Sequence, residues 1–338
     1  MTNQETFQAL ANIDALSELD DLTLSTGVDE ANIRIGVASC LFYEGGATAE
    51  RRVEANGVLR DYRERFDKHL THYHPMGARR HRPFGKVEPI DYYDKRARTM
   101  GERETYGAGL YGFDGGRDDG NAPRHYIANI GRARRSPFSD VTAYLPVSTF
   151  ATRGWNALID LVLEWCALLC PAHGTAGLGL LPDTGNFMSH LAPIAFPGLR
   201  RHPGLDWPHT GAWALEAADA KKRHIRTVNW LTVLDEAFVD ALGGPARVRD
   251  ALGAVCAIHE WRAANPTRTP ATGIVIQAGS KPRLGDVNRG DIPEAYRAVA
   301  RLTAPLRLET FDPRFGLLRL RPPFDPAEES LRWVRRFD

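Results

Sequence analysis

Residues 32–43 read NIRIGVASCLFY, and this stretch decides much of the fold of a chain of 338 residues. Its apolar side chains alternate at Ile33, Ile35 and Val37, which is the two-residue period of a β-strand. Residues 47–69 follow with Val53, Val58, Leu59, Tyr62 and Phe66 at roughly helical spacing among Arg and Glu. The pair predicts a strand followed by an amphipathic helix.

Three strand-like runs come next, at residues 106–113, 125–130 and 141–147, separated by clusters of Gly, Asp and Asn. Short strands with such turns between them are typical of an antiparallel meander. Residues 155–170 (WNALIDLVLEWCALLC) are apolar on nearly every face, so we expect a buried helix. Residues 174–181 then predict a further strand, and a long polar loop is expected to begin at residues 74–77, before the first of the three strand-like runs.

The second half also mixes helices and strands. Helices are expected at 186–195, 235–242, 245–259, 293–302 and 326–337, and strands at 225–233, 273–278 and 317–320. This order predicts an α+β fold with a mixed, largely antiparallel sheet or sheets flanked by helices. We divide the chain into an acidic N-terminal arm (1–30) and two packed α+β halves (31–182 and 183–338). Whether the halves share one sheet stays open.

The composition narrows the class of function. The chain has 43 Lys and Arg against 42 Asp and Glu, for a formal charge of +1, and only four cysteines. The balance gives no reason to expect nucleic acid or an anionic membrane as partner, and the cysteines form no disulfide framework. The first residues lack the basic, apolar and small-residue order of a secretory signal peptide. No apolar run reaches the length of about 18 residues that a membrane-spanning helix needs. We expect a cytoplasmic protein.

The first 30 residues carry seven acidic side chains and no Lys, Arg or His. Such a segment can dock on the basic stretch 79–103 of its own chain, or on a basic partner. It can also be a solvated N-terminus that contacts neither. The three interpretations stay open at this point.

Ligand-like groups occur twice, as Cys166, Cys170 and His173, and as His69, His72, His74 and His81. Neither completes the usual four-ligand or facial set, so we expect no metal. Gly177 and Gly179 lack the third glycine of a dinucleotide fingerprint, and a strand with close backbone approach explains them better. We expect no cofactor, no catalytic residue and no small-molecule substrate.

One turn keeps an alternative open. Residues 279–290 (GSKPRLGDVNRG) place Asp286, Asn288 and Arg289 close together in sequence. These groups can line an active site of unknown reaction, or they can bond their own turn. An enzyme with a polar site at these three residues is the alternative to the function below.

Four blocks carry a family resemblance: FYEGGATAERRVEANGVLRDYRERF (42–66), HGTAGLGLLPD (173–183), VNWLTVLDEAFVDALGG (228–244) and QAGSKPRLGDVNRGDIPEAYRAVARLTAPLR (277–307). In this order they resemble the type VI secretion immunity family, the TsiV-like proteins, over about residues 32–310. The resemblance implies a non-enzymatic antitoxin that neutralises a cognate effector made beside it. It also implies that the effector is a cytoplasm-acting nuclease of the VRR-NUC or a related type.

The resemblance leaves the contact surface to be found. A nuclease has a basic DNA-binding surface, which an acidic patch can cover while steering association. The acidic candidates for partner binding are Glu18, Asp20, Asp21, Asp29, Glu30, Asp114, Asp118 and Asp119. Aromatic side chains are the physical alternative, since they carry much interface energy. For these we select Trp207 and Trp213, which we expect to be exposed in the Pro/Gly-rich segment 201–213.

Overall fold

Strand β2 (Ile33–Tyr43), the stretch quoted first above, lies near the middle of one large sheet. The computed structural model describes residues 2–27, 32–116, 121–133, 136–183, 188–218, 220, 222–264, 271–314 and 316–338. Within these residues eleven strands share the sheet, in the order β10-β11-β9-β8-β2-β7-β6-β5-β3-β4, with β1 also paired to β2. Each of these strand pairs is antiparallel.

The other strands are short or of medium length: β1 (Thr23–Leu24), β3 (His72–Tyr73), β4 (Arg82–Pro83), β5 (Tyr106–Gly112), β6 (His125–Gly131), β7 (Ser139–Leu145), β8 (His173–Pro182), β9 (Leu231–Asp235), β10 (Cys256–Arg262) and β11 (Thr272–Ala278). The α-helices are α1 (Asn3–Leu10), α2 (Ala49–Phe66), α3 (Pro89–Thr99), α4 (Ser148–Ala151), α5 (Asn156–Leu169), α6 (Met188–Arg201), α7 (Thr210–Ala218), α8 (Glu236–Ala241), α9 (Gly244–Leu252), α10 (Glu294–Thr303) and α11 (Pro326–Val334). Short 3-10 turns include η1 (Leu16–Asp21), η3 (Asp114–Gly116) and η5 (Val287–Arg289).

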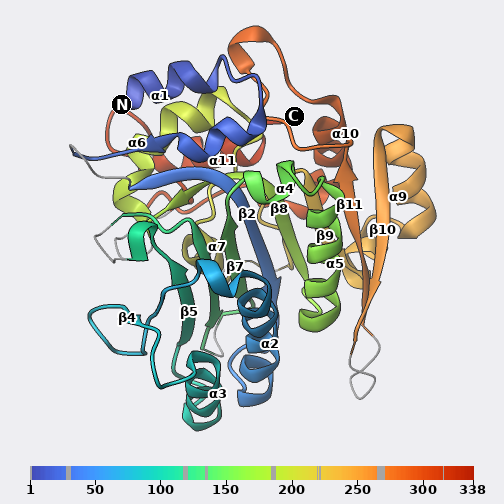
Figure 1. Cartoon of the computed structure of the whole chain (residues 1–338). Helices are drawn as coiled ribbons and strands as arrows, with labels where there is room; N and C mark the ends of the chain where they lie inside the picture. Colours follow the sequence, from blue (N-terminus) through green and yellow to red (C-terminus); the bar gives the residue numbers. More distant parts are fainter. Residues whose placement is uncertain are drawn as a thin grey trace.

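Helices cover both faces of the sheet, with α2 and α5 on the near side in Figure 1 and α7 and α11 behind. Every residue of β2 is therefore buried. On the near side, Tyr43 of β2 donates a hydrogen bond to Asn129 of β6, whose amide donates to Asn56 of α2. On the far side, Phe42 meets the ring of Trp213 at a centroid distance of 6.5 Å. Tyr43 and Phe42, which are neighbours in β2, thus pack on opposite faces of the sheet.

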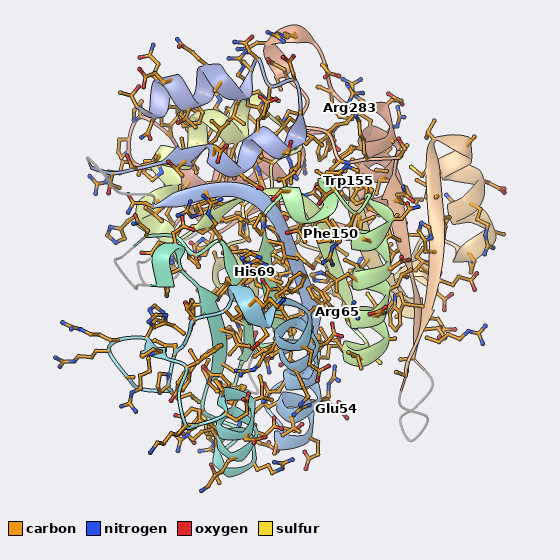
Figure 2. The ribbon with its side chains drawn as sticks, viewed as in Figure 1. Glu54, Arg65, His69, Phe150, Trp155 and Arg283 are labelled. Atoms are coloured by element: carbon orange, nitrogen blue, oxygen red, sulfur yellow. The ribbon has the colours of Figure 1, made fainter. Side chains whose placement is uncertain are left out.

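Helices α2 and α5 are joined by a small polar network at the front of the molecule. Trp165 donates from its indole N–H to Asp61 of α2 at 2.8 Å. Arg65 pairs with Asp61 and with Glu164 of α5, and Figure 2 shows its side chain between the two helices. The network satisfies the indole N–H and orients α5 against α2.

The predicted α+β class and the antiparallel β5-β6-β7 meander are confirmed. Strands from both expected halves belong to one sheet, because β8 pairs with β9. The interpretation of Gly177 and Gly179 as sites of close backbone approach is also confirmed. A Cβ at 177 would lie 2.5 Å from the Asn229 side-chain oxygen, and one at 179 would lie 2.8 Å from the Cβ of Ala38.

Three expected elements are wrong. The polar loop expected to begin at residues 74–77 contains helix α3, which begins with Glu88 as its cap and Pro89 in the first turn. The expected helix 245–259 ends at Leu252 because Gly253 adopts a φ of 54°, and the chain continues as strand β10. Residues 317–320 form no strand. The side-chain oxygen of Ser330 accepts from the amides of Leu317 and Leu318, so these groups need no neighbouring strand.

A fully buried ion pair holds the Pro/Gly-rich segment 202–209 against β8. Arg226 donates to both carboxylate oxygens of Asp206, at 2.8 and 2.5 Å, and also to the Thr175 hydroxyl of β8 and the Trp207 carbonyl. Burial alone would raise the pKa of Asp206, but the charge and hydrogen bonds of Arg226 outweigh it and lower that pKa. The carboxylate is therefore ionised and fully bonded.

Removal of this carboxylate is expected to cost much of the stability of the fold. Asp206→Asn leaves the Arg226 charge buried without its counter-ion, which destabilises proteins by about 3–5 kcal/mol. Asp291→Asn is the matched control, since its half-exposed pair with Arg283 is worth at most about 1 kcal/mol. Chemical denaturation measures both variants. Equal small losses would show that the buried pair is dispensable.

Buried neutral histidines predict sensitivity to mild acid. Burial lowers the pKa of His125 to about 3 and that of His209 to about 4, and it also lowers the pKa values of His173 and His202. Below the unfolded pKa of about 6.5, the unfolded chain takes up protons that the folded chain refuses. Each histidine then removes up to about 1.4 kcal/mol of stability per pH unit.

The free energy of unfolding should accordingly fall between pH 7 and pH 5. His125→Phe keeps an aromatic ring beside His69 and cannot titrate, so its loss over the same range should be smaller. Denaturation curves at the two pH values provide the measurement. A free energy that does not change with pH would contradict the neutral, buried state of these side chains.

Candidate partner-binding surface

The acidic N-terminal segment packs on the body of the protein instead of extending from it. Leu10, Leu19 and Leu24 are buried, and β1 pairs with β2. Within the described residues, no hydrogen bond or ion pair joins the segment to the basic stretch 79–103. The segment bonds instead to Arg124, which donates to the Asp20 carbonyl, and to Arg289, which donates to Asn12.

The acidic side chains of η1 differ in what they do. Both carboxylate oxygens of Asp20 accept backbone amides at the start of α4, from Val147 at 2.6 Å and Ser148 at 2.9 Å. Glu18 is exposed and accepts from the Ala15 amide. Asp21 is exposed, and within the described residues it makes no side-chain hydrogen bond or ion pair. Asp20 is thus structural, whereas Asp21 and Glu18 face solvent.

Asp114 lies close to this segment and is largely neutralised. One of its oxygens pairs with Arg34 of β2 and the other with Arg124, each at 2.7 Å. Arg124 therefore links Asp114 to the η1 backbone. Four other acidic candidates, Asp29, Glu30, Asp118 and Asp119, lie outside the described residues.

The expectation that Trp207 and Trp213 are exposed is wrong, because both side chains are fully buried. Asp206 holds the segment against β8, and its backbone bonds Leu178 and Leu180 on that strand. Trp213 lies edge-on to the ring of His173, at 5.9 Å. A Pro/Gly-rich composition is typical of loops at the surface, but here the ion pair folds the segment over the sheet.

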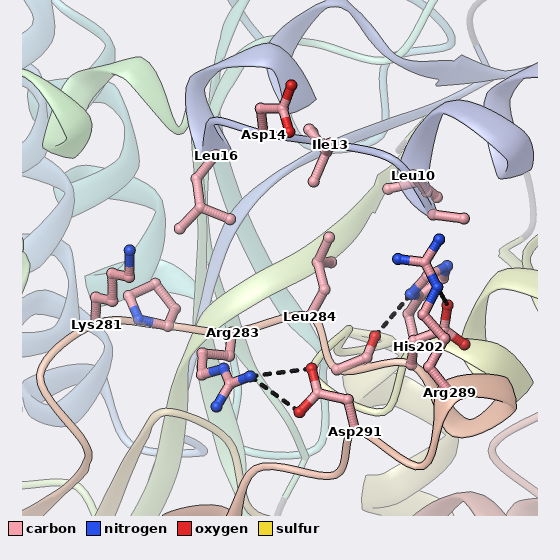
Figure 3. Close-up of a pocket in the computed structure, with 14 residues that line it drawn as sticks. Leu10, Ile13, Asp14, Leu16, His202, Lys281, Arg283, Leu284, Arg289 and Asp291 are labelled. Atoms are coloured by element: carbon pink, nitrogen blue, oxygen red, sulfur yellow. Dashed lines mark hydrogen bonds and ion pairs between the residues drawn. The ribbon is translucent and has the colours of Figure 1, made fainter.

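The turn around Asp286 lines a pocket of about 240 Å³ between the N-terminal segment and residues 281–291 (Figure 3). Asp286 accepts hydrogen bonds from both Nε and Nη2 of Arg201 and one from the Asn288 amide. The Arg201 guanidinium holds the pKa of Asp286 below its usual value. Arg283 pairs with Asp291 across the same pocket, as the dashed lines in Figure 3 show. These bonds satisfy the Asp286 carboxylate, which counts against its use as a catalytic base.

The possible metal ligands are not brought together. Cys166 is buried in α5, Cys170 ends that helix in a left-handed conformation, and His173 packs among aromatic rings. His69 stacks on His125, while His74 and His81 contact each other. Within the described part of the chain, no three His, Cys, Asp or Glu side chains form a group able to hold a metal ion.

Comparison with known proteins gives the family. A family model described as "TsiV: Type VI immunity for VRR-NUC" matches residues 56–337. The chain belongs to this family of type VI immunity proteins. The match includes α11 and so extends further toward the C-terminus than residue 310.

One solved structure similar to this immunity protein is "Pseudomonas aeruginosa T6SS protein PA0821". The TM-score is 0.74 at 18% sequence identity, and the match covers 92% of this chain and 83% of that one. At this identity the similarity concerns the fold alone. A comparison with curated proteins finds no match. No helix among the described residues of the immunity protein is long and apolar enough to cross a membrane.

Sequence reasoning missed two features of the surface. The contact of Asp20 with the amides of α4 joins residues 127 and 128 positions apart, so no local motif indicates it. A second hollow, of about 250 Å³, lies between α6 and α11. Its lining includes Phe196, Val287 and Trp333, which are far apart in sequence. The amphipathic pattern of the two helices was the available signal, but it did not show that one face stays partly open.

The two neighbouring carboxylates of η1 should respond differently to truncation. Asp20→Ala removes the cap of α4 and is expected to cost about 1 kcal/mol of stability of the immunity protein. Asp21→Ala removes only an exposed charge and should change stability by less than about 0.5 kcal/mol. Thermal unfolding of the two variants provides the comparison. Identical unfolding temperatures would show that the Asp20 contact has no structural value.

Proposed function

We propose that this immunity protein binds and neutralises a cognate type VI effector, a nuclease of the VRR-NUC type, by covering its active or DNA-binding surface. The observation that carries the proposal is the family match over residues 56–337. The bonded state of Asp286 also favours a binding role over an enzymatic one. Because such a toxin acts on DNA, its antidote would act in the cytoplasm of the producing cell.

The charge of the two surfaces supports this mode of inhibition. A nuclease presents cationic groups to phosphates around carboxylates that hold a divalent metal. The η1 segment presents Glu18 and Asp21 to solvent. Exposed carboxylates at the rim of an interface mainly raise the association rate, and salt screens their effect. They suit an antidote that must capture its toxin before DNA is cut.

The effector encoded beside the gene should form a stable complex with this chain when the two are co-expressed. The double variant Glu18→Gln/Asp21→Asn should associate several-fold more slowly at low salt and show a weaker salt dependence. Glu309→Gln, at an exposed residue of another segment, is the control and should leave the rate unchanged. Stopped-flow or surface-based kinetics measure the rates.

Two results would count against the proposal in different ways. If the wild-type chain neither binds the neighbouring effector nor protects cells that express it, the antidote function for that effector is wrong. If binding is tight but the double variant associates like the wild type, the η1 carboxylates do not face the partner. In that case the interface lies elsewhere on the molecule.

A further inference from the structure

A groove of about 250 Å³ separates helices α6 and α11, and its lining is mostly apolar. The apolar side chains are Phe196, Leu199, Val287, Ile292, Leu318 and Trp333. They come from α6, from η5 and the residues after it, from the segment before α11, and from α11 itself. The groove is therefore a product of tertiary packing and belongs to none of these elements alone.

Two exposed apolar side chains lie at or beside the groove. Val287 is 46% exposed and Phe324 is 39% exposed, which makes them two of six large apolar side chains left open among the described residues. The ring of Phe324 meets that of Phe196 edge-on at 4.9 Å. Contiguous exposed apolar surface with a concave shape is typical of an interaction site.

Positive charge predominates around the same walls. Arg200 is exposed and lies over the Phe196 ring at 5.5 Å. Arg332 already pairs with Glu329, the one carboxylate of the lining. Arg336 donates to the carbonyls of Pro203 and Val228 and to other neutral oxygens, and no carboxylate accepts from it in the described structure. The lining thus holds three guanidinium groups against one carboxylate.

We propose that this groove docks a segment of the protein partner that carries a large apolar side chain next to a carboxylate. The apolar side chain would pack between Phe196 and Ile292, and the carboxylate would pair with Arg200. This inference rests on the proposed function, which identifies the partner as the effector, and it adds an anchor distinct from the η1 carboxylates.

The test uses the full-length chain and the effector encoded beside it. Val287→Glu places a carboxylate at the mouth of the groove and should weaken binding at least about tenfold, the effect of losing a central contact. Arg200→Glu should weaken it similarly and should also reduce the salt dependence of affinity. Calorimetry gives the Kd, and thermal unfolding checks that each variant is folded.

Matched controls distinguish a specific effect of the groove on binding from a general effect of the changed charge. Val255, the residue before β10, is 47% exposed, so Val255→Glu adds the same charge at nearly the same exposure away from the groove. Arg247→Glu on α9 is the control for Arg200→Glu. Both controls should bind the effector as the wild-type chain does.

Three outcomes would overturn the inference. If Val287→Glu and Arg200→Glu bind like the wild type, the groove is not the anchor, although the proposed function stands. If the wild-type chain forms a dimer that Val287→Glu abolishes, the groove is a self-association surface. If the wild-type chain does not bind the effector at all, the proposed function and the groove assignment fail together.

Discussion

The buried pair of Asp206 and Arg226 is the interaction on which the rest of the structure depends. It fixes the segment between α6 and α7 across β8, and through Trp207 and Thr175 it joins that segment to the centre of the sheet. Arg336, near the end of α11, bonds the carbonyls of Pro203 and Val228, which flank the same pair in sequence. The C-terminal helix is therefore positioned against α6 by bonds that extend outward from one buried carboxylate.

That constraint also explains which surfaces are open. Because segment 202–209 lies on the sheet, Trp207 belongs to the core, as does Trp213 of α7, and neither side chain is exposed for a contact. Arg336, just after the end of α11, holds that helix beside α6, and a gap with apolar walls lies between the two helices. The N-terminal segment lies across a pocket from the Asp286 turn, and its Glu18 and Asp21 side chains are exposed. The surfaces proposed to contact the partner are thus one acidic edge and one apolar, cationic groove.

The sequence predicted those strands and turns that local periodicity and turn residues indicate. The alternation at residues 33–37 and the runs around β5, β6 and β7 identified the central strands, and the glycines of β8 were correctly read as sites of close approach. It could not predict contacts between distant residues, such as Asp20 with Ser148 or Asp206 with Arg226. The exposure of Trp207 was misjudged for this reason, since composition suggested a loop while one distant arginine buried it. The family, and with it the proposed function, came from long blocks of similarity and not from any catalytic pattern.

The most direct test of the central claim is the cleavage of DNA by the purified cognate effector while this chain is added in increasing amounts. If the chain covers the active or DNA-binding surface, cleavage should fall in proportion to the complex formed and stop when every effector molecule is bound, and the complex should no longer bind DNA. Cleavage that continues at the normal rate in a saturated complex would contradict the account.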